Sequence, residues 1–299
     1  MGLISKIKTA IRLVKQGNYS EIYVRTASLM KKRKIIKRGG LAVSAVTAIV
    51  THKCTLRCKG CAALMHHFKS PQTMPREQVI RDIGLIMDKI DYAHILLLVG
   101  GETFLIDNIS EYVSSALEYK DKFGLIVITT NGTIMPSDDE FANLAKFRKY
   151  INIEISDYGE KSAHLKSLQE KLRKLKISCK INNEKWQEWQ QVIDGQSDDY
   201  AANNYKNCLA AADSNFILCN GKLYHCGFLA SGEVLRSMPY SPENNVNLLD
   251  PKVTRGDIIK YKSLDSVPPG CNHCGGYTKD AAVIAKAEQL SEPLDYKIY

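Results

Sequence analysis

Short apolar runs rich in β-branched residues alternate with longer amphipathic stretches through the first two thirds of the chain. The short runs predict buried strands, and the longer stretches, with apolar residues at helical spacing, predict helices. The strands are expected at 42–50, 94–99, 124–129, 150–156 and 177–182. The helices are expected at about 75–90, 108–122, 137–148 and 160–175. Alternating strands and helices of this length predict an α/β fold with a parallel sheet built from βαβ units.

The alternation stops in the segment 183–207, which contains both tryptophans of the chain, Trp186 and Trp189. These two rings could wall a substrate pocket or anchor the segment on the side of the sheet, and the structural role is favoured. A sixth barrel strand is expected to be either degenerate or within 185–218. Further on, residues 216–224 predict a β-hairpin that turns at an Asn-Gly pair.

The chain has 299 residues, enough for one barrel-sized domain and a small extra module. Its net charge of +9 belongs to residues 1–40, which hold eleven Lys and Arg against one acid. Apolar residues at helical spacing in this segment predict an N-terminal helix: Leu3, Ile4, Ile7, Ile11 and Val14. A helix packed on the barrel with a solvated basic face is favoured over a weak contact with a membrane surface. Nucleic acid is not an expected partner, because the basic residues lack interleaved aromatics.

The sequence shows no export signal and no apolar run of the roughly 18 residues that a membrane span needs. Seven of its nine cysteines fall in metal-ligand spacings. The expected compartment is therefore the cytoplasm, where thiols stay reduced.

Three of these cysteines, Cys54, Cys58 and Cys61, share one short loop directly after the first predicted strand. A structural zinc site closes with four protein ligands, and a full iron–sulfur cubane takes four cysteines. A CxxxCxxC loop therefore leaves one metal corner open for another molecule. In a β/α barrel, the end of the sheet where such a loop lies is the face that carries the chemistry.

Further motifs follow the next strands in order: Gly-Gly-Glu at 100–102, Thr-Asn-Gly at 130–132 and Ser-Asp at 156–157. Together with the cysteine loop they resemble the signature of the radical S-adenosylmethionine (SAM) superfamily. Two residues depart from the usual pattern: Gly60 stands where an aromatic is common, and Thr103 stands where proline is common.

The resemblance implies that the three cysteines hold a [4Fe–4S] cluster whose open iron chelates SAM. Glu102 would accept a hydrogen bond from the ammonium group of SAM, and the two glycines would let the backbone approach the cofactor. The residues implied in SAM binding are Gly100, Gly101, Glu102, Asn131 and Ser156.

A second set consists of Cys208, Cys226, Cys271 and Cys274. These spacings permit a zinc site equally well. However, C-x12-G-x4-C followed by a distant CxxC resembles the SPASM/Twitch extension of radical SAM enzymes, which implies one auxiliary [4Fe–4S] cluster. The tail of the cysteine loop and residues 155–159 are similar to members found with polysaccharide biosynthesis functions.

Two cysteines remain outside both sets. Cys179 lies in a predicted buried strand, and Cys219 lies on the predicted hairpin. Cys219 is the candidate catalytic residue, as a hydrogen-atom donor to a substrate radical. For each of them, the role of a small buried apolar side chain is favoured.

The resemblance implies a partial (β/α)6 TIM-like barrel with a small C-terminal Twitch-type iron–sulfur module. The expected divisions are a basic helical extension (1–41), the barrel with its linker (42–207), and the auxiliary module with a C-terminal helix (208–299). The expected reaction is dehydrogenation of a sugar or cyclitol, with a small molecule or glycan precursor as substrate and a flavodoxin or ferredoxin as electron donor. The alternatives are a carbohydrate epimerase, a maturase of ribosomal peptides, and a non-enzymatic scaffold with two zinc sites.

Overall fold

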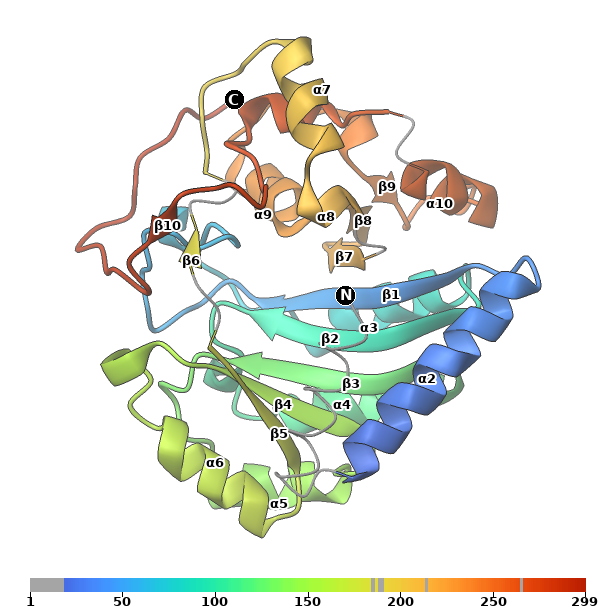
Figure 1. The fold of residues 1–299 in the computed structure, drawn as a ribbon, viewed down its shortest axis with the longest axis vertical. Helices are drawn as coiled ribbons and strands as arrows, with labels where there is room; N and C mark the ends of the chain where they lie inside the picture. Colours follow the sequence, from blue (N-terminus) through green and yellow to red (C-terminus); the bar gives the residue numbers. More distant parts are fainter. Residues whose placement is uncertain (1–18, 184–185, 188–190, 213–214, 264–265) are drawn as a thin grey trace.

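A computed structural model describes residues 19–183, 186–187, 191–212, 215–263 and 266–299 of the chain. Its centre is an eight-stranded sheet with the order β5-β4-β3-β2-β1-β7-β8-β9 (Figure 1). The strands are β1 (Ala42–Thr51), β2 (Tyr92–Gly100), β3 (Phe123–Thr130), β4 (Ile151–Ser156), β5 (Ser178–Asn182), β7 (Asn215–Cys219), β8 (Lys222–Tyr224) and β9 (Val246–Asn247). Strands β1 to β5 and β7 pair in parallel, and β8 and β9 add antiparallel pairs at one edge.

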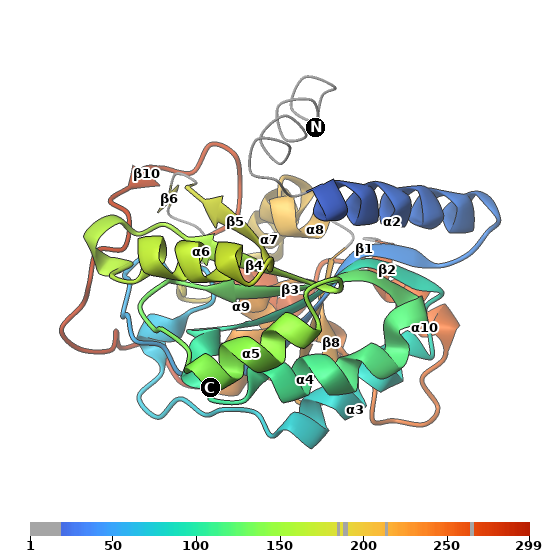
Figure 2. The ribbon, with the colours of Figure 1, turned by 90° about the horizontal axis from the view of Figure 1, so that it is seen from below.

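Helices cover both faces of the sheet. One face carries α3 (Arg76–Met87), α4 (Ile109–Ala116), α5 (Asp138–Lys146) and α6 (Leu165–Lys174). The basic helix α2 (Tyr19–Lys37) lies on the opposite face from α3, α4 and α5 (Figure 2). Apolar side chains of the strands and of α3 to α6 form one continuous core, because a parallel sheet between helices buries its strands almost completely.

The predicted α/β fold and its five strands are confirmed, and each strand begins and ends within two residues of its expected position. The predicted helix 108–122 divides into α4 and a 3-10 helix, Leu117–Lys122. A sixth parallel strand exists, but it is β7, and it lies beside β1 rather than next to β5. Strand β6 (Trp186–Gln187) instead pairs with β10 (Val283–Ile284) in a separate two-stranded sheet.

The predicted hairpin is confirmed as the antiparallel pair β7 and β8. Its turn residues Asn220 and Gly221 have φ values of 52° and 76°, the left-handed region that a tight hairpin turn requires. Because β7 pairs with β1, this hairpin continues the barrel sheet. The predicted division at residue 207 therefore does not separate two sheets.

The rest of the C-terminal part is helical before it becomes irregular. It contains α7 (Asp198–Lys206), α8 (Leu209–Ala212), α9 (Gly227–Leu235), α10 (Arg255–Lys262) and the 3-10 helix η6 (Pro269–His273). The predicted C-terminal helix is wrong, since within residues 275–299 the only regular element is β10. This segment instead follows the cysteine loop, as shown below.

The described part of the basic N-terminal segment packs on the sheet. Arg25 of α2 forms a 3.1 Å ion pair with Glu154 of β4. Ser28 Oγ lies 2.7 Å from His94 Nδ1 and accepts a hydrogen bond from the Tyr92 hydroxyl. The apolar positions predicted to form a helix over residues 3–14 lie outside the described residues. Among the helices that are described, none is both long and apolar enough to span a bilayer.

Candidate functional site

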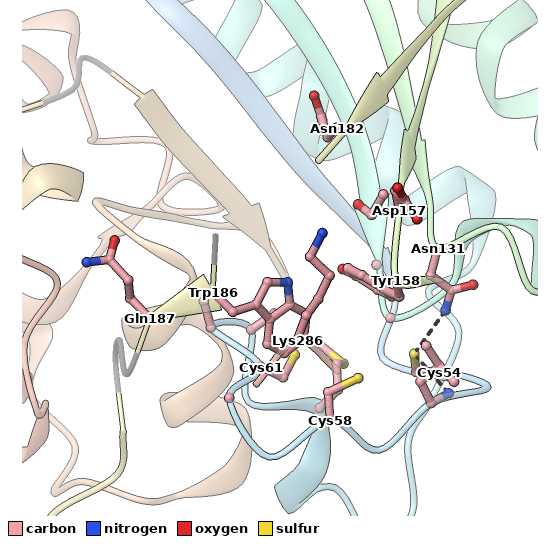
Figure 3. A pocket seen from close by; sticks show the side chains of 18 residues that line it. Cys54, Cys58, Cys61, Asn131, Asp157, Tyr158, Asn182, Trp186, Gln187 and Lys286 are labelled. Atoms are coloured by element: carbon pink, nitrogen blue, oxygen red, sulfur yellow. Dashed lines mark hydrogen bonds between the residues drawn. The ribbon is translucent and has the colours of Figure 1, made fainter. Parts of the chain in front are cut away.

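A cavity of about 340 Å³ lies where β1 to β5 end, at the carboxyl edge of the parallel sheet. The cysteine loop forms its floor, and the ends of four strands and the small β6–β10 sheet form its walls (Figure 3). The side chains and backbone that line it include Cys54, Cys58, Cys61, Gly100, Gly101, Asn131, Ser156, Asp157, Tyr158, Asn182, Trp186, Gln187 and Lys286. The structure thus brings the three loop cysteines together with four of the five residues expected to bind SAM.

The three loop thiols lie close enough to affect one another's ionisation. Burial raises the pKa of Cys54 to about 12, and the charges of Cys61 and Cys58 add to this shift. Burial also raises the pKa of Cys58 to about 11, although a hydrogen bond from Gln289 opposes the shift. Such thiols are protonated near neutral pH unless a metal displaces their protons.

Backbone N–H groups point at the sulfurs of this loop. Leu56 N donates to Cys54 Sγ over 3.4 Å, and the N–H groups of residues 63–65 lower the pKa of Cys61 against the effect of burial. Donors of this kind stabilise negative charge on sulfur. The loop is therefore built to hold thiolates.

The two glycines of the Gly-Gly-Glu motif dock the end of β2 against the cysteine loop. Gly101 N donates to Thr51 O over 3.0 Å, and Glu102 N donates to Lys53 O over 2.8 Å. A Cβ on Gly101 would lie 2.6 Å from Cys54 Cβ, closer than real Cβ contacts allow. Glycine is thus needed at this position for close approach to the protein's own cysteine loop, besides any approach to a ligand.

Glu102 is fully buried and has three hydrogen-bond donors within the chain. Its carboxylate accepts from Phe104 N over 2.9 Å, and from Thr130 Oγ1 and Asn131 N over 2.7 Å each. Burial raises its pKa, and these hydrogen bonds oppose the rise. Glu102 is not among the described residues that line the cavity. The structure shows it joining the ends of β2 and β3, and its contact with SAM stays a prediction.

Asn131 and Ser156 do line the cavity, each at the end of a strand. Asn131 Nδ2 lies 3.2 Å from Thr55 Oγ1 and 3.6 Å from Cys54 Sγ, so this amide joins the β3 turn to the cysteine loop. Ser162 Oγ donates to the backbone carbonyls of both residues and fixes the two turns relative to each other.

The small β6–β10 sheet crosses the cysteine loop at Gly60. A side chain at Gly60 would collide with Ile284 of β10 and would contact the ring of Trp186. Trp186 also packs edge-on against Tyr158, with ring centroids 5.1 Å apart. The position where similar loops carry an aromatic is therefore covered here by residues far away in the sequence. Trp186 lines the cavity and also anchors its segment against Tyr158, and Trp189 lies outside the described residues.

The members of the second cysteine set lie on different elements, and two of them, Cys226 and Cys274, pack against the same apolar cluster. Burial is the largest cause that raises the pKa of Cys226, to about 12, and of Cys271 and Cys274. Charges of the other thiols in the set, including Cys208, add to each shift. Burial raises the pKa of Tyr205 as well, and the charges of Cys271, Cys208 and Cys226 add to this shift.

Neither set has the geometry of a site for a single metal ion. Within the described ranges, no three His, Cys, Asp or Glu side chains are placed so that one ion could bind them all. In an iron–sulfur cluster each cysteine binds a different iron, so the sulfurs lie further apart than around one zinc ion.

Cys219 and Cys179 do not join either set. Cys219 is only 2% exposed and packs in an apolar cluster with Tyr224 and Phe228. Burial raises its pKa to about 12, and it is not among the described residues that line the cavity. Cys179 is half-buried on β5 against the main core.

Three cavity residues had no sequence motif to reveal them. Asn182 lies at the end of β5, Gln187 follows Trp186, and Lys286 comes from the segment after β10 (Figure 3). The general rule that ligands bind at the carboxyl ends of parallel strands could have indicated Asn182. Nothing in the sequence indicated Lys286.

Comparisons with known proteins agree with this architecture. Residues 48–194 match the family model of the radical SAM superfamily. The structure resembles that of BtrN in complex with AdoMet and 2-DOIA, with 14% identity and a TM-score of 0.51 over 84% of this chain and 98% of BtrN. A weaker similarity is to anSMEcpe with bound AdoMet, with 13% identity and a TM-score of 0.45 over 83% of this chain and 90% of that protein. Another is to Streptococcus suis SuiB bound to S-adenosylmethionine, with 20% identity and a TM-score of 0.39 over 50% of this chain and 36% of SuiB. A search of curated proteins gave no match.

Proposed function

Because residues 48–194 are a radical SAM superfamily domain, we propose that Cys54, Cys58 and Cys61 hold its [4Fe–4S] cluster and that the enzyme dehydrogenates a small polar substrate. Bound together, cluster and SAM supply a 5′-deoxyadenosyl radical, which removes a hydrogen atom from an unactivated carbon. The proposal rests mainly on one observation: the three thiols and the ends of the parallel strands line the same cavity, which has a volume of about 340 Å³.

The residues present fit such a cluster. The loop offers three thiols and no fourth, which leaves one iron free to bind SAM. Its N–H groups point at sulfur, and such donors stabilise the negative charge of cluster thiolates.

SAM is expected beside the ends of β2, β3 and β4. Gly100 and Gly101 present backbone without side chains there, and Asn131 and Ser156 add polar groups. In this arrangement Glu102 does not line the cavity. Its carboxylate accepts a hydrogen bond from the backbone N–H of Asn131 and so fixes the turn that faces the cofactor.

The remaining lining favours a compact substrate with several hydrogen-bonding groups. Asp157 can accept from hydroxyl or ammonium groups, Lys286 can donate, and the amide of Asn182 can do both. The Trp186 ring adds an apolar surface for the carbon face of a ring-shaped substrate. A sugar or cyclitol has this mixture of groups. The fold shared with BtrN, whose structure contains AdoMet together with 2-DOIA, supports room for a small second molecule.

Dehydrogenation also needs an acceptor for the electron left on the substrate radical. We assign this role to an auxiliary cluster held by Cys208, Cys226, Cys271 and Cys274. The packing of Cys226 and Cys274 against one apolar cluster and the effect of these thiols on one another's pKa support the assignment. The substrate then loses one hydrogen atom to the deoxyadenosyl radical, one proton to solvent and one electron to this cluster. Epimerisation would need a hydrogen donor in the cavity, and Cys219 is not among the described residues that line it.

The test is anaerobic reconstitution of the full chain, followed by iron and sulfide analysis and assay with SAM and dithionite. We expect close to eight irons per chain, for two [4Fe–4S] clusters, and slow release of 5′-deoxyadenosine without substrate. In the cell we expect a cytoplasmic flavodoxin or ferredoxin to replace dithionite. Iron-replete, reduced protein that releases no 5′-deoxyadenosine would refute the proposal.

A further inference from the structure

The C-terminal segment 286–299 runs along the cysteine loop and is absent from every motif discussed above. In Figure 1 this red segment passes next to the blue loop that follows β1. Two backbone hydrogen bonds join them: Lys59 N donates to Glu288 O, and Leu290 N donates to Arg57 O, each over 2.9 Å. The tail thus adds a short antiparallel bridge to the loop, centred on one residue pair.

That central pair is Cys58 and Gln289. Gln289 Nε2 donates to Cys58 Sγ over 3.1 Å and to Ala287 O over 2.8 Å. Its Oε1 accepts from Arg57 N over 2.8 Å. These contacts fix the orientation of the amide, because a flipped group would place its oxygen against a carbonyl oxygen and its NH2 against an N–H. The contacts with Arg57 N and Ala287 O therefore orient the Gln289 amide so that an N–H group points at the sulfur.

This donor differs from those of the neighbouring sulfur. Cys54 Sγ receives Leu56 N over 3.4 Å and Asn131 Nδ2 over 3.6 Å, both longer than the contact from Gln289. The donor to Cys58 is a side chain 231 residues further along the chain. It can therefore be removed by one substitution outside the cysteine loop.

We propose that Gln289 is a positioning residue for the first cluster, and that its N–H raises the reduction potential of that cluster. The inference rests on the proposed function, since it requires a cluster on Cys58. Reduction adds negative charge that is shared by the cysteine sulfurs, so a hydrogen bond to sulfur stabilises the reduced form more than the oxidised form. A tail residue thus sets how easily the cluster is reduced before SAM is cleaved.

The test is a potentiometric titration of the reconstituted full chain, followed by the EPR signal that changes when SAM is added. Gln289→Leu keeps the approximate size of the side chain but removes both the donor to Cys58 Sγ and the acceptor for Arg57 N, whereas Gln289→Glu, below, removes only the donor. We expect its one-electron equilibrium constant for reduction to fall about tenfold, which corresponds to about 59 mV. Glu292→Gln, at an exposed position of the same tail, is the matched control and should titrate like the wild type.

Gln289→Glu provides a second variant in case leucine prevents cluster loading. One carboxylate oxygen can keep the contact with Arg57 N, while the other faces the sulfur with negative charge, so the potential should fall further than in the leucine variant. An unchanged potential in either loaded variant would overturn the inference. Absence of a SAM-sensitive cluster from the wild type would instead refute the proposed function.

Discussion

The two cysteine sets offer the same ligand chemistry in opposite surroundings. Cys54, Cys58 and Cys61 line an open cavity with polar groups from the strand ends. The second set lies near the buried rings of Tyr205 and Tyr261, whose pKa values are raised by burial and, to a smaller extent, by charges of these thiols. The first environment suits a cluster that must bind another molecule. The second suits one that exchanges only electrons.

The sets also differ in how far apart their members lie along the chain. The first is confined to eight residues of one loop. In the second, Cys208 follows α7, Cys226 caps the N-terminus of α9, and the CxxC pair belongs to η6 and the residue after it. Metal bound by ligands so far apart cross-links the fold, whereas metal on a single loop does not. The predictions below test this contrast between reactivity and stability.

The largest effect is expected from replacing all three loop cysteines, Cys54, Cys58 and Cys61, with alanine. The variant should lose about half of the iron and all SAM cleavage, because no other described thiol lines the cavity. Its thermal unfolding should change little, since the loop is local. Iron analysis, assay of 5′-deoxyadenosine and calorimetry are the measurements. Cys179→Ala is the control, and an unchanged iron content in the triple variant would contradict the site assignment.

The second prediction concerns Cys271→Ala combined with Cys274→Ala. This variant should lose the other half of the iron and still cleave SAM in the absence of substrate, because the first set is untouched. Removing the cross-link should lower Tm by about 5–10 °C, which is about 2–3 kcal/mol for a chain of this size. A Tm equal to that of the wild type would show that the second set does not cross-link the fold.

A smaller effect is expected from Glu102→Gln, behind the cavity. The amide keeps one acceptor oxygen but turns an NH2 group toward donors such as Asn131 N, which loses a 2.7 Å hydrogen bond. A buried donor left without a partner costs about 1–3 kcal/mol, so chemical denaturation should show a loss of this size. Glu160→Gln, at an exposed site, should leave stability unchanged. Equal stability of the two variants would contradict the structural role of Glu102.

Much of this site could be predicted because its signals are local. The strands, the cysteine loop and the glycines after β2 each depend on short patterns of residue type, and the order of the motifs placed them at one edge of the sheet. The expected reason for a glycine at position 101, close approach of the backbone to the cofactor, was incomplete, however. The backbone that approaches it is that of Lys53 in the protein's own loop, which no local pattern shows. A bulky residue there would distort the cysteine loop and could not test SAM binding alone.

The remaining features depend on contacts between distant segments. Lys286 and Gln289 lie in a stretch without helical or strand periodicity, so its path along the cysteine loop left no signal in the sequence. The same applies to β7, whose hairpin was clear but whose partner strand β1 was not. The spacing of hydrophobic residues identifies a helix or strand and its buried face, but it does not identify which other element packs or pairs with it.

The smallest expected effect separates oxidation from epimerisation. Cys219→Ala removes a buried sulfur from the cluster around Tyr224 and Phe228, which should cost about 1 kcal/mol of stability. Because this thiol is not among the described residues that line the cavity, turnover of a known substrate should stay within about twofold of wild type (1.4 kcal/mol being tenfold) and yield an oxidised product. In an epimerase that used Cys219, the same change would abolish inversion while 5′-deoxyadenosine still formed. Mass spectrometry in deuterated solvent distinguishes the two, since epimerisation places deuterium at the reacting carbon of an unoxidised product.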